Sequence, residues 1–146
     1  MKWVWLGSSI LLTTFVFGMS GTSGETSGSL SLSLATWAAD LLDFITPWFT
    51  EHLETFHLVI RKSAHVAEYF LLGIAWTRTA VLFQWRLRLI LLLGMGIALL
   101  DEGVQLIALD RGPSLLDALL FDFPGYFFGW GLIHLLKNHQ RPTNAS

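Results

Sequence analysis

The chain has 146 residues, of which 53% are hydrophobic and only 14% are charged, and its mean hydropathy is +0.55. Soluble domains usually carry about 25% charged residues, so this composition argues against a soluble globule. The absence of cysteine excludes disulfides, iron–sulfur centres, zinc–thiolate sites and thiol nucleophiles. The net charge of −2 gives no reason to expect nucleic acid as a partner. We therefore expect an all-α, polytopic membrane protein with a single domain.

Four apolar segments have the length that a membrane span requires. A spanning helix needs about 20 mostly apolar residues, with about 17 as the lower limit. The first segment could also be a signal peptide, but three further hydrophobic segments follow it, so we interpret it as an uncleaved span. The predicted transmembrane helices cover residues 3–19, 64–82, 87–107 and 115–136.

The distribution of basic residues predicts the orientation, because lysine and arginine are retained in short cytoplasmic loops. With the N-terminus inside, six of the nine basic residues face the cytoplasm: Lys2, Arg78, Arg86, Arg88, Lys137 and Arg141. Only Arg61, Lys62 and Arg111 lie outside. We therefore expect four spans with both termini in the cytoplasm.

The segment between the first two spans has two parts. In residues 20–33, eleven of the fourteen residues are serine, glycine or threonine, a composition typical of a flexible linker. In residues 34–60, apolar residues recur at helical spacing with a break at Pro47. This pattern predicts one or two amphipathic helices on the outer membrane surface, or helices packed over the external mouth of the bundle.

The second span begins with a polar stripe, because residues three or four positions apart share one face of a helix. The stripe consists of Arg61, Lys62, His65, Glu68 and Tyr69. His65 and Glu68 could hold one divalent metal ion or transfer a proton. The alternative is a hydrogen-bonded pair that only fixes the packing of two helices.

The third span ends with a second polar group, formed by Asp101, Glu102 and Gln105. Two adjacent carboxylates in a membrane are costly unless a cation neutralises them or one of them holds a proton, as a general acid does. The alternative is an ion-pair network with the external basic residues. Gly94 lies on nearly the same face, where it would let another backbone approach.

Polar residues also surround the start of the fourth span. Arg111 suits binding of a carboxylate or a phosphate. Asp117 follows Ser114 by three residues, a spacing typical of a helix-capping box.

The fourth span itself contains Asp122, Pro124 and the pair Gly125 and Gly129. The glycine spacing indicates a helix-packing face. Pro124 predicts a kink unless it lies in the first turn of the helix.

These polar blocks carry a resemblance over nearly the whole chain. The stretch Arg-Lys-Ser-Ala-His-Val-Ala-Glu-Tyr at 61–69 resembles the Lys-x-Ala-His-x-x-Glu-Tyr signature of the VanZ-like family. The order of Asp101, Glu102, Gln105, Arg111 and Asp117 is similar to the second block of that family. The resemblance implies a small integral membrane protein associated with reduced susceptibility to teicoplanin. It implies no established reaction or substrate.

Two positions depart from the family pattern. Val104 stands where members often have histidine, so a role for that histidine does not transfer. Asp122 follows Asp117 by five residues instead of the usual four. One extra residue rotates the following side chains by about 100° in a regular helix, unless a π-bulge or a kink at Pro124 absorbs it.

Three functions are consistent with the sequence. In a membrane enzyme, His65 or Glu68 would act as base, Asp101 or Glu102 as acid, and the substrate would be a membrane lipid or a lipid-linked cell-wall precursor. In a non-catalytic binder, the same outward-facing pocket would bind such a ligand. In a structural protein, the cluster would only lock the bundle beside a membrane-protein partner. The predicted binding residues are Arg61, Lys62, Tyr69, Gln105, Arg111, Asp117 and Asp122.

Overall fold

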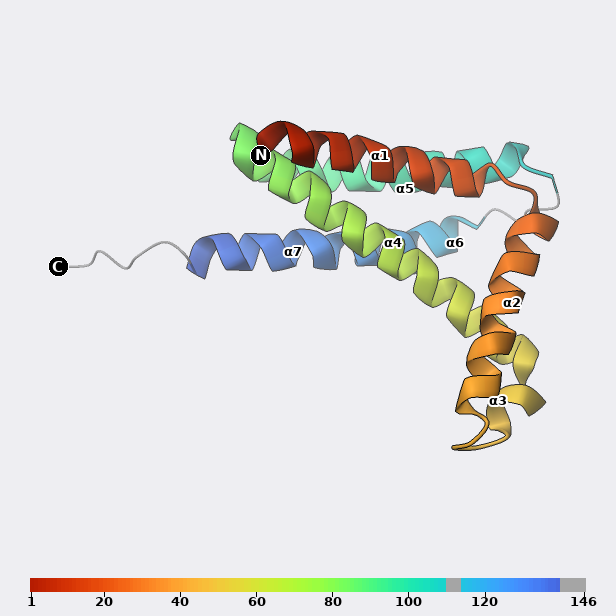
Figure 1. Ribbon diagram of the computed structural model, residues 1–146. Coiled ribbons are helices and arrows are strands. Elements are labelled where there is room, and N and C mark those ends of the chain that lie inside the picture. Colours follow the sequence, from red (N-terminus) through yellow and green to blue (C-terminus); the bar gives the residue numbers. More distant parts are fainter. Residues whose placement is uncertain (110–113, 140–146) are drawn as a thin grey trace.

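The computed structural model describes residues 1–109 and 114–139, and this part of the chain is helical without strands (Figure 1). Four helices are long and apolar enough to cross a membrane, which confirms the all-α, polytopic prediction. The elements are α1 (Lys2–Ser20), α2 (Gly24–Leu42), α3 (Trp48–Glu51), α4 (Leu53–Phe83), α5 (Leu87–Ile107), α6 (Leu115–Asp117), η1 (Ala118–Asp122) and α7 (Phe123–His139).

The spanning helices agree with the predicted spans except at the start of α4. Helix α4 begins at Leu53, well before the predicted start at residue 64. Its 31 residues correspond to about 46 Å, which exceeds a hydrocarbon core of about 30 Å. The helix therefore has to tilt or to project from the membrane. Figure 1 shows α4 crossing α7 obliquely, with its N-terminal end leaving the bundle beside α2.

The structure corrects the flexible linker predicted for residues 20–33, because α2 begins at Gly24. The side chain of Ser23 caps the helix by accepting a hydrogen bond from the backbone N–H of Thr26. Ser31 forms a hydrogen bond of 2.7 Å with Nε2 of His57 on α4. Contacts with α4 thus stabilise a helix that its serine and glycine content alone disfavours.

Residues 34–60 are helical on both sides of Pro47, which precedes the first residue of α3. In Figure 1, α2 runs across the direction of α1 and α5. Several large apolar side chains of this region are exposed: Leu34, Trp37, Leu41, Phe44 and Ile45. Their exposure is what an interfacial segment requires, and the location on the outer membrane surface stays a prediction.

Glycines allow α4 and α7 to pack backbone to backbone. A Cβ atom added at Gly129 would lie 2.2 Å from the carbonyl oxygen of Phe70, and one at Gly73 would lie 2.2 Å from that of Tyr126. A Cβ atom at Gly125 would lie 2.6 Å from the carbonyl oxygen of Val66. These distances confirm that Gly125 and Gly129 form a helix-packing face.

Gly94 also permits a close contact, although an aromatic ring approaches it and not, as the sequence had led us to expect, another backbone. A Cβ atom at this position would lie 2.3 Å from the ring of Tyr126. Tyr126 is fully buried and belongs to the main hydrophobic core, together with Tyr69 and Leu72 of α4. The missing side chain at Gly94 therefore admits an aromatic ring between α5 and α7.

Hydrogen bonds between side chains join α1 to α4. The hydroxyl groups of Ser9 and Thr79 lie 3.0 Å apart and are buried. Nε1 of Trp76 donates a hydrogen bond of 3.1 Å to Oγ1 of Thr13. Such bonds hold helices together where lipid removes the hydrophobic driving force for their association.

A π-helical turn opens the last span. The backbone N–H of Phe123 donates to the carbonyl of Ala118, five residues earlier, so η1 holds one residue more than a regular turn. Pro124 follows directly, and its ring would clash with the carbonyl four residues before it in a regular helix. Of the two ways to absorb the extra residue before Asp122, the chain uses the π-bulge.

We predict that Gly129→Ala destabilises the folded protein, whereas Gly131→Ala does not. The new Cβ atom at position 129 meets backbone atoms of α4, which cannot rotate away, while no atom lies within 4 Å of a Cβ atom at position 131. Overpacking of this kind lowers the free energy of unfolding by about 1–3 kcal/mol, and alanine in an open helical position raises it by up to about 1 kcal/mol. Thermal unfolding in detergent measures both. Equal unfolding temperatures for the two variants would contradict the close packing.

Candidate functional site

Buried polar side chains gather at one end of the bundle. Asp101 and Asp122 are fully buried, and Glu102 and Gln105 are 4% and 5% exposed. They lie near the C-terminal end of α5 and the start of the last span, at the opposite end from the start of α1 and the end of α7 (Figure 1). Because burying polar groups in a membrane is costly, this end of the bundle is the candidate functional site.

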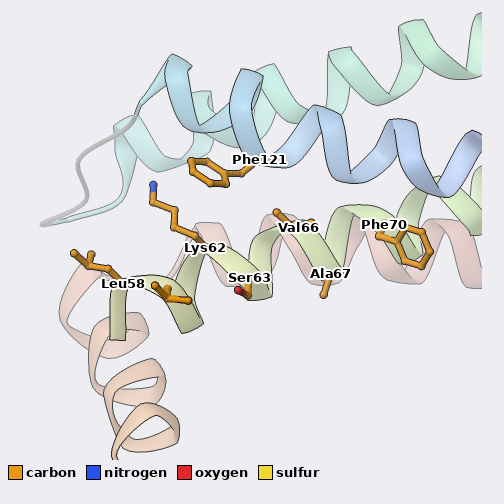
Figure 2. A pocket seen from close by; sticks show the side chains of 8 residues that line it. Leu58, Lys62, Ser63, Val66, Ala67, Phe70 and Phe121 are labelled. Atoms are coloured by element: carbon orange, nitrogen blue, oxygen red, sulfur yellow. The ribbon is translucent and has the colours of Figure 1, made fainter. Parts of the chain in front are cut away.

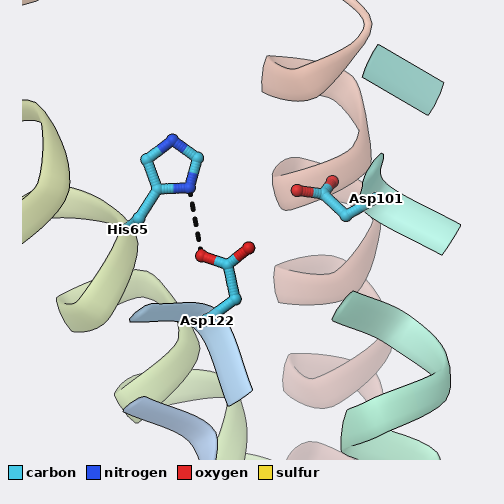
Figure 3. A group of neighbouring side chains, drawn as sticks. All are labelled: His65, Asp101 and Asp122. Carbon is cyan, nitrogen blue, oxygen red and sulfur yellow. Dashed lines mark ion pairs between the residues drawn. The ribbon is translucent and has the colours of Figure 1, made fainter. Parts of the chain in front are cut away.

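His65, Asp101 and Asp122 form the centre of the site, from α4, α5 and η1 respectively (Figure 3). Nδ1 of His65 lies 3.3 Å from Oδ1 of Asp122. One nitrogen or oxygen atom from each of the three side chains lies within 4.8 Å of the others. Three helices far apart in the sequence thus bring an imidazole and two carboxylates together.

Gln105 and Tyr69 surround this centre. Nε2 of Gln105 donates a hydrogen bond of 3.3 Å to Oδ2 of Asp101, one helical turn away on α5. Tyr69 is fully buried, and its hydroxyl lies near the carboxylates of Asp101 and Asp122. Both side chains therefore contribute hydrogen-bonding groups to the buried centre.

Glu102 and Ser114 hold the start of the last span. Oε2 of Glu102 accepts a hydrogen bond of 2.6 Å from the backbone N–H of Ser114. Oγ of Ser114 accepts one of 3.3 Å from the backbone N–H of Asp117, as the predicted cap requires. Asp117 in turn forms an ion pair with Nζ of Lys62 on α4. The acid at 102 thus has a structural contact that connects α5 to α6.

Two cavities adjoin the centre formed by His65, Asp101 and Asp122. Glu68 lies on the wall of a cavity of about 150 Å³ between α2 and α4, which Arg61 and His65 also line. A small polar cavity lies between α4, α5 and the last span, and its wall includes Arg61, Lys62 and Gln105. Among the predicted site residues, Arg111 lies outside the residues that the structure describes.

An apolar groove begins beside the polar centre. Figure 2 shows Phe121 of η1 opposite the side chains that α4 presents, with Lys62 extending toward its ring. Nζ of Lys62 lies 4.8 Å from the centre of that ring. The groove has a volume of about 660 Å³, and its wall is mostly apolar. Its lining residues are Leu58, Val59, Lys62, Ser63, Val66, Ala67, Phe70 and Phe121.

The sequence did not single out Phe121. This residue lines both the groove and the small polar cavity, and it lies under the ammonium group of Lys62. No sequence pattern marked it, because the pairing of Asp117 with the same lysine is seen only in the structure. Asp122, whose spacing departs from the family pattern, is instead at the centre of the site.

This arrangement can perform two kinds of chemistry. The imidazole and the buried carboxylates can exchange a proton or bind a cation. Lys62 and Arg61, next to the apolar groove, can bind an anionic group attached to a hydrocarbon chain. The three residues at the centre are the ones best placed to hold a metal ion, and Glu68 is not part of that group.

We predict that Glu102→Ala loosens the start of the last span. The backbone N–H of Ser114 loses its acceptor, which costs about 1–3 kcal/mol and accelerates local amide exchange by about tenfold to a hundredfold. Hydrogen exchange of peptides that begin near residue 114 measures the effect. Glu102→Gln keeps an acceptor oxygen and should preserve most of the protection, and Glu54→Ala, in the first turn of α4, serves as a control. Unchanged exchange in Glu102→Ala would refute this role.

Comparison with known proteins identifies the family. No curated protein and no solved structure matches the chain. The family model described as VanZ/LLP1 matches residues 5–137, which is nearly the whole sequence and includes every residue of the candidate site. The match confirms the resemblance carried by the two polar blocks, and the chain belongs to the VanZ/LLP1 family.

Proposed function

We propose that the protein binds a membrane lipid or lipid-linked cell-wall precursor with an anionic headgroup, and that this binding lowers susceptibility to teicoplanin-type glycopeptides or otherwise maintains the cell envelope. The observation that carries the proposal is the apolar groove whose wall includes Lys62, next to the buried polar centre. An amphipathic ligand needs both surfaces side by side.

The groove supports the binding of a hydrocarbon chain. Along α4 the wall of the groove is formed by Val66, Ala67 and Phe70, which are apolar (Figure 2). These residues belong to a helix that is long and apolar enough to cross a membrane. Ligand sites for small molecules occupy about 300–1,000 Å³, a range that includes the volume of this groove. A lipid tail in the groove would exchange one apolar surface for another, so specificity has to come from the headgroup.

Lys62 and Arg61 support the binding of a phosphate. Lys62 lines both the groove and the small polar cavity, so one side chain borders the sites proposed for the tail and for the headgroup. Arg61 lines the same polar cavity. Guanidinium and ammonium groups form strong, charge-assisted hydrogen bonds with phosphate oxygens. Asp117 would release Lys62 or share it with the ligand.

The orientation from the basic residues would place this end of the bundle outside the bacterial cytoplasmic membrane. That face is where glycopeptides meet cell-wall precursors. The exposed apolar surface of α2 and of the following loop, including Trp37 and Phe44, would lie in the outer leaflet and bring lipids to the groove. Whether the polar centre also catalyses a reaction on the bound lipid is an outcome of the experiment below.

We expect two variants to weaken binding and to lose protection together. Lys62→Gln removes the positive charge, and Ala67→Phe fills the groove. Leu71→Phe is the matched control for Ala67→Phe, because Leu71 is exposed on α4 and does not line the groove. Loss of a charge-assisted contact should weaken binding of a polyprenyl phosphate by about tenfold or more. Native mass spectrometry from nanodiscs measures binding, with phosphatidylcholine as the neutral lipid.

The same variants are then compared in a teicoplanin-sensitive Gram-positive host at matched membrane abundance. The wild type and Leu71→Phe should raise the inhibitory concentration above that of the empty vector, and the other two variants should not. Chemical change of the bound polyprenyl phosphate, lost in Glu68→Gln, would identify an enzyme. Equal protection by Lys62→Gln, Ala67→Phe and the wild type would contradict the groove as the binding site.

A further inference from the structure

We infer that His65, Asp101 and Asp122 bind a divalent first-row metal ion between α4, α5 and η1 (Figure 3). The inference goes beyond lipid binding, because it concerns the buried centre and needs no ligand in the groove. Four independent features of this centre support it: the spacing of the ligand atoms, their unused hydrogen-bonding capacity, the balance of charge and the type of donor atom.

The spacing of the ligand atoms is close to that of a coordination shell. Metal–ligand bonds of about 2.0–2.2 Å place neighbouring ligand atoms about 3–3.5 Å apart. Nδ1 of His65 and Oδ1 of Asp122 lie 3.3 Å apart, at that separation. Asp101 faces the same space from α5, with all three ligand atoms within 4.8 Å.

The carboxylates have unused lone pairs although they are fully buried. Within residues 1–109 and 114–139, Oδ2 of Asp122 and Oδ1 of Asp101 have no hydrogen-bond partner, and Oδ1 of Asp122 has only the 3.3 Å contact with Nδ1 of His65. Buried polar atoms are normally satisfied, so such a group of unpaired oxygens requires a cause. The hydroxyl of Tyr69 is also buried and lies near both carboxylates. A cation coordinated at this point would use the carboxylate lone pairs.

Gln105 holds one of the ligands in position. Its amide donates to Oδ2 of Asp101 and leaves Oδ1 for the metal. Metal-binding side chains are commonly oriented by a second hydrogen bond of this kind. Tyr69, on the other side, can donate its hydroxyl hydrogen to a carboxylate or offer its oxygen as a further ligand. We therefore assign Gln105 as a positioning residue.

The charge around the centre favours a cation. Among the described residues, the centre and the small polar cavity beside it contain four carboxylates, on Asp101, Glu102, Asp117 and Asp122. The basic side chains there are Arg61, Lys62 and His65, and Lys62 is paired with Asp117. This set is negative even when His65 is protonated. A divalent cation reduces the imbalance where the membrane makes unpaired charge costly.

The donor atoms define the class of metal. One imidazole nitrogen and two carboxylates suit zinc, manganese or ferrous iron. The chain has no cysteine, so soft thiolate ligands that would select Cu(I) are absent. An imidazole ligand distinguishes the site from the all-oxygen sites that magnesium and calcium prefer. Zinc and cobalt are therefore the probes of choice, cobalt because its visible spectrum reports coordination.

The test uses the full chain in phosphatidylcholine nanodiscs, stripped with a chelator and titrated with Zn²⁺. Elemental analysis should find about one zinc per chain in the wild type. His65→Gln and Asp122→Asn should each weaken zinc binding by more than about a hundredfold, and Gln105→Leu by about 10–100-fold, as loss of an orienting contact does. His134→Gln and Asp43→Asn should bind as the wild type does, because they remove the same chemical groups away from the centre.

Cobalt substitution provides a second measurement, which uses only the wild-type protein and so does not depend on whether a variant folds. Visible absorption bands typical of a nitrogen- and oxygen-coordinated ion in the wild type support the site, and a spectrum of free aqueous cobalt overturns it. Wild-type affinity in Asp122→Asn also overturns it and leaves an ion pair between His65 and Asp122. Binding of Mg²⁺ in preference to Zn²⁺ overturns the assignment of a first-row transition metal or zinc. No polyprenyl phosphate is present, so failure of lipid binding leaves this result unaffected.

Discussion

The close packing of α4 against α7 is the constraint on which the candidate site depends. Gly125 and Gly129 let the last span approach the carbonyl oxygens of Val66 and Phe70, and Val66 is the neighbour of His65. At this separation the start of the last span brings Asp122 into contact with the imidazole. A side chain at either glycine would move the two helices apart, so packing and polar contacts at this end of the bundle are coupled.

The π-helical turn η1 solves a problem of register. An extra residue before Asp122 would rotate Gly125 and Gly129 away from α4 in a regular helix. The wider turn takes up this residue between Ala118 and Phe123, so both the aspartate and the glycines face α4. Pro124 favours the wider turn because its ring conflicts with a regular one. A local irregularity thus satisfies the packing face and the buried centre at once, as π-bulges at functional sites often do.

The polar residues at this end of the bundle divide into contacts that hold the helices and groups that remain available. Glu102, Ser114, Asp117 and Lys62 connect α5, α6 and α4 through hydrogen bonds and one ion pair. These contacts account for part of the cluster in purely structural terms, as one of the three interpretations of the sequence expected. The group of His65, Asp101 and Asp122 is different, because Oδ1 of Asp101 and Oδ2 of Asp122 are buried without a hydrogen-bond partner in the described part of the chain. The proposed lipid and metal functions concern this second set and the groove beside it.

The sequence by itself determined the membrane class, the approximate spans, the cap at Ser114 and the family, because length, apolar content, helical spacing and short polar blocks are local properties. Only the tertiary structure decided which polar residues meet. The spacing of His65 and Glu68 suggested a pair on one helix, whereas the partners of His65 come from α5 and η1. The sequence also indicated a linker in residues 20–33, where contacts with α4 stabilise a helix. Both differences have one physical reason: the approach of segments distant in sequence depends on packing surfaces that no local pattern contains.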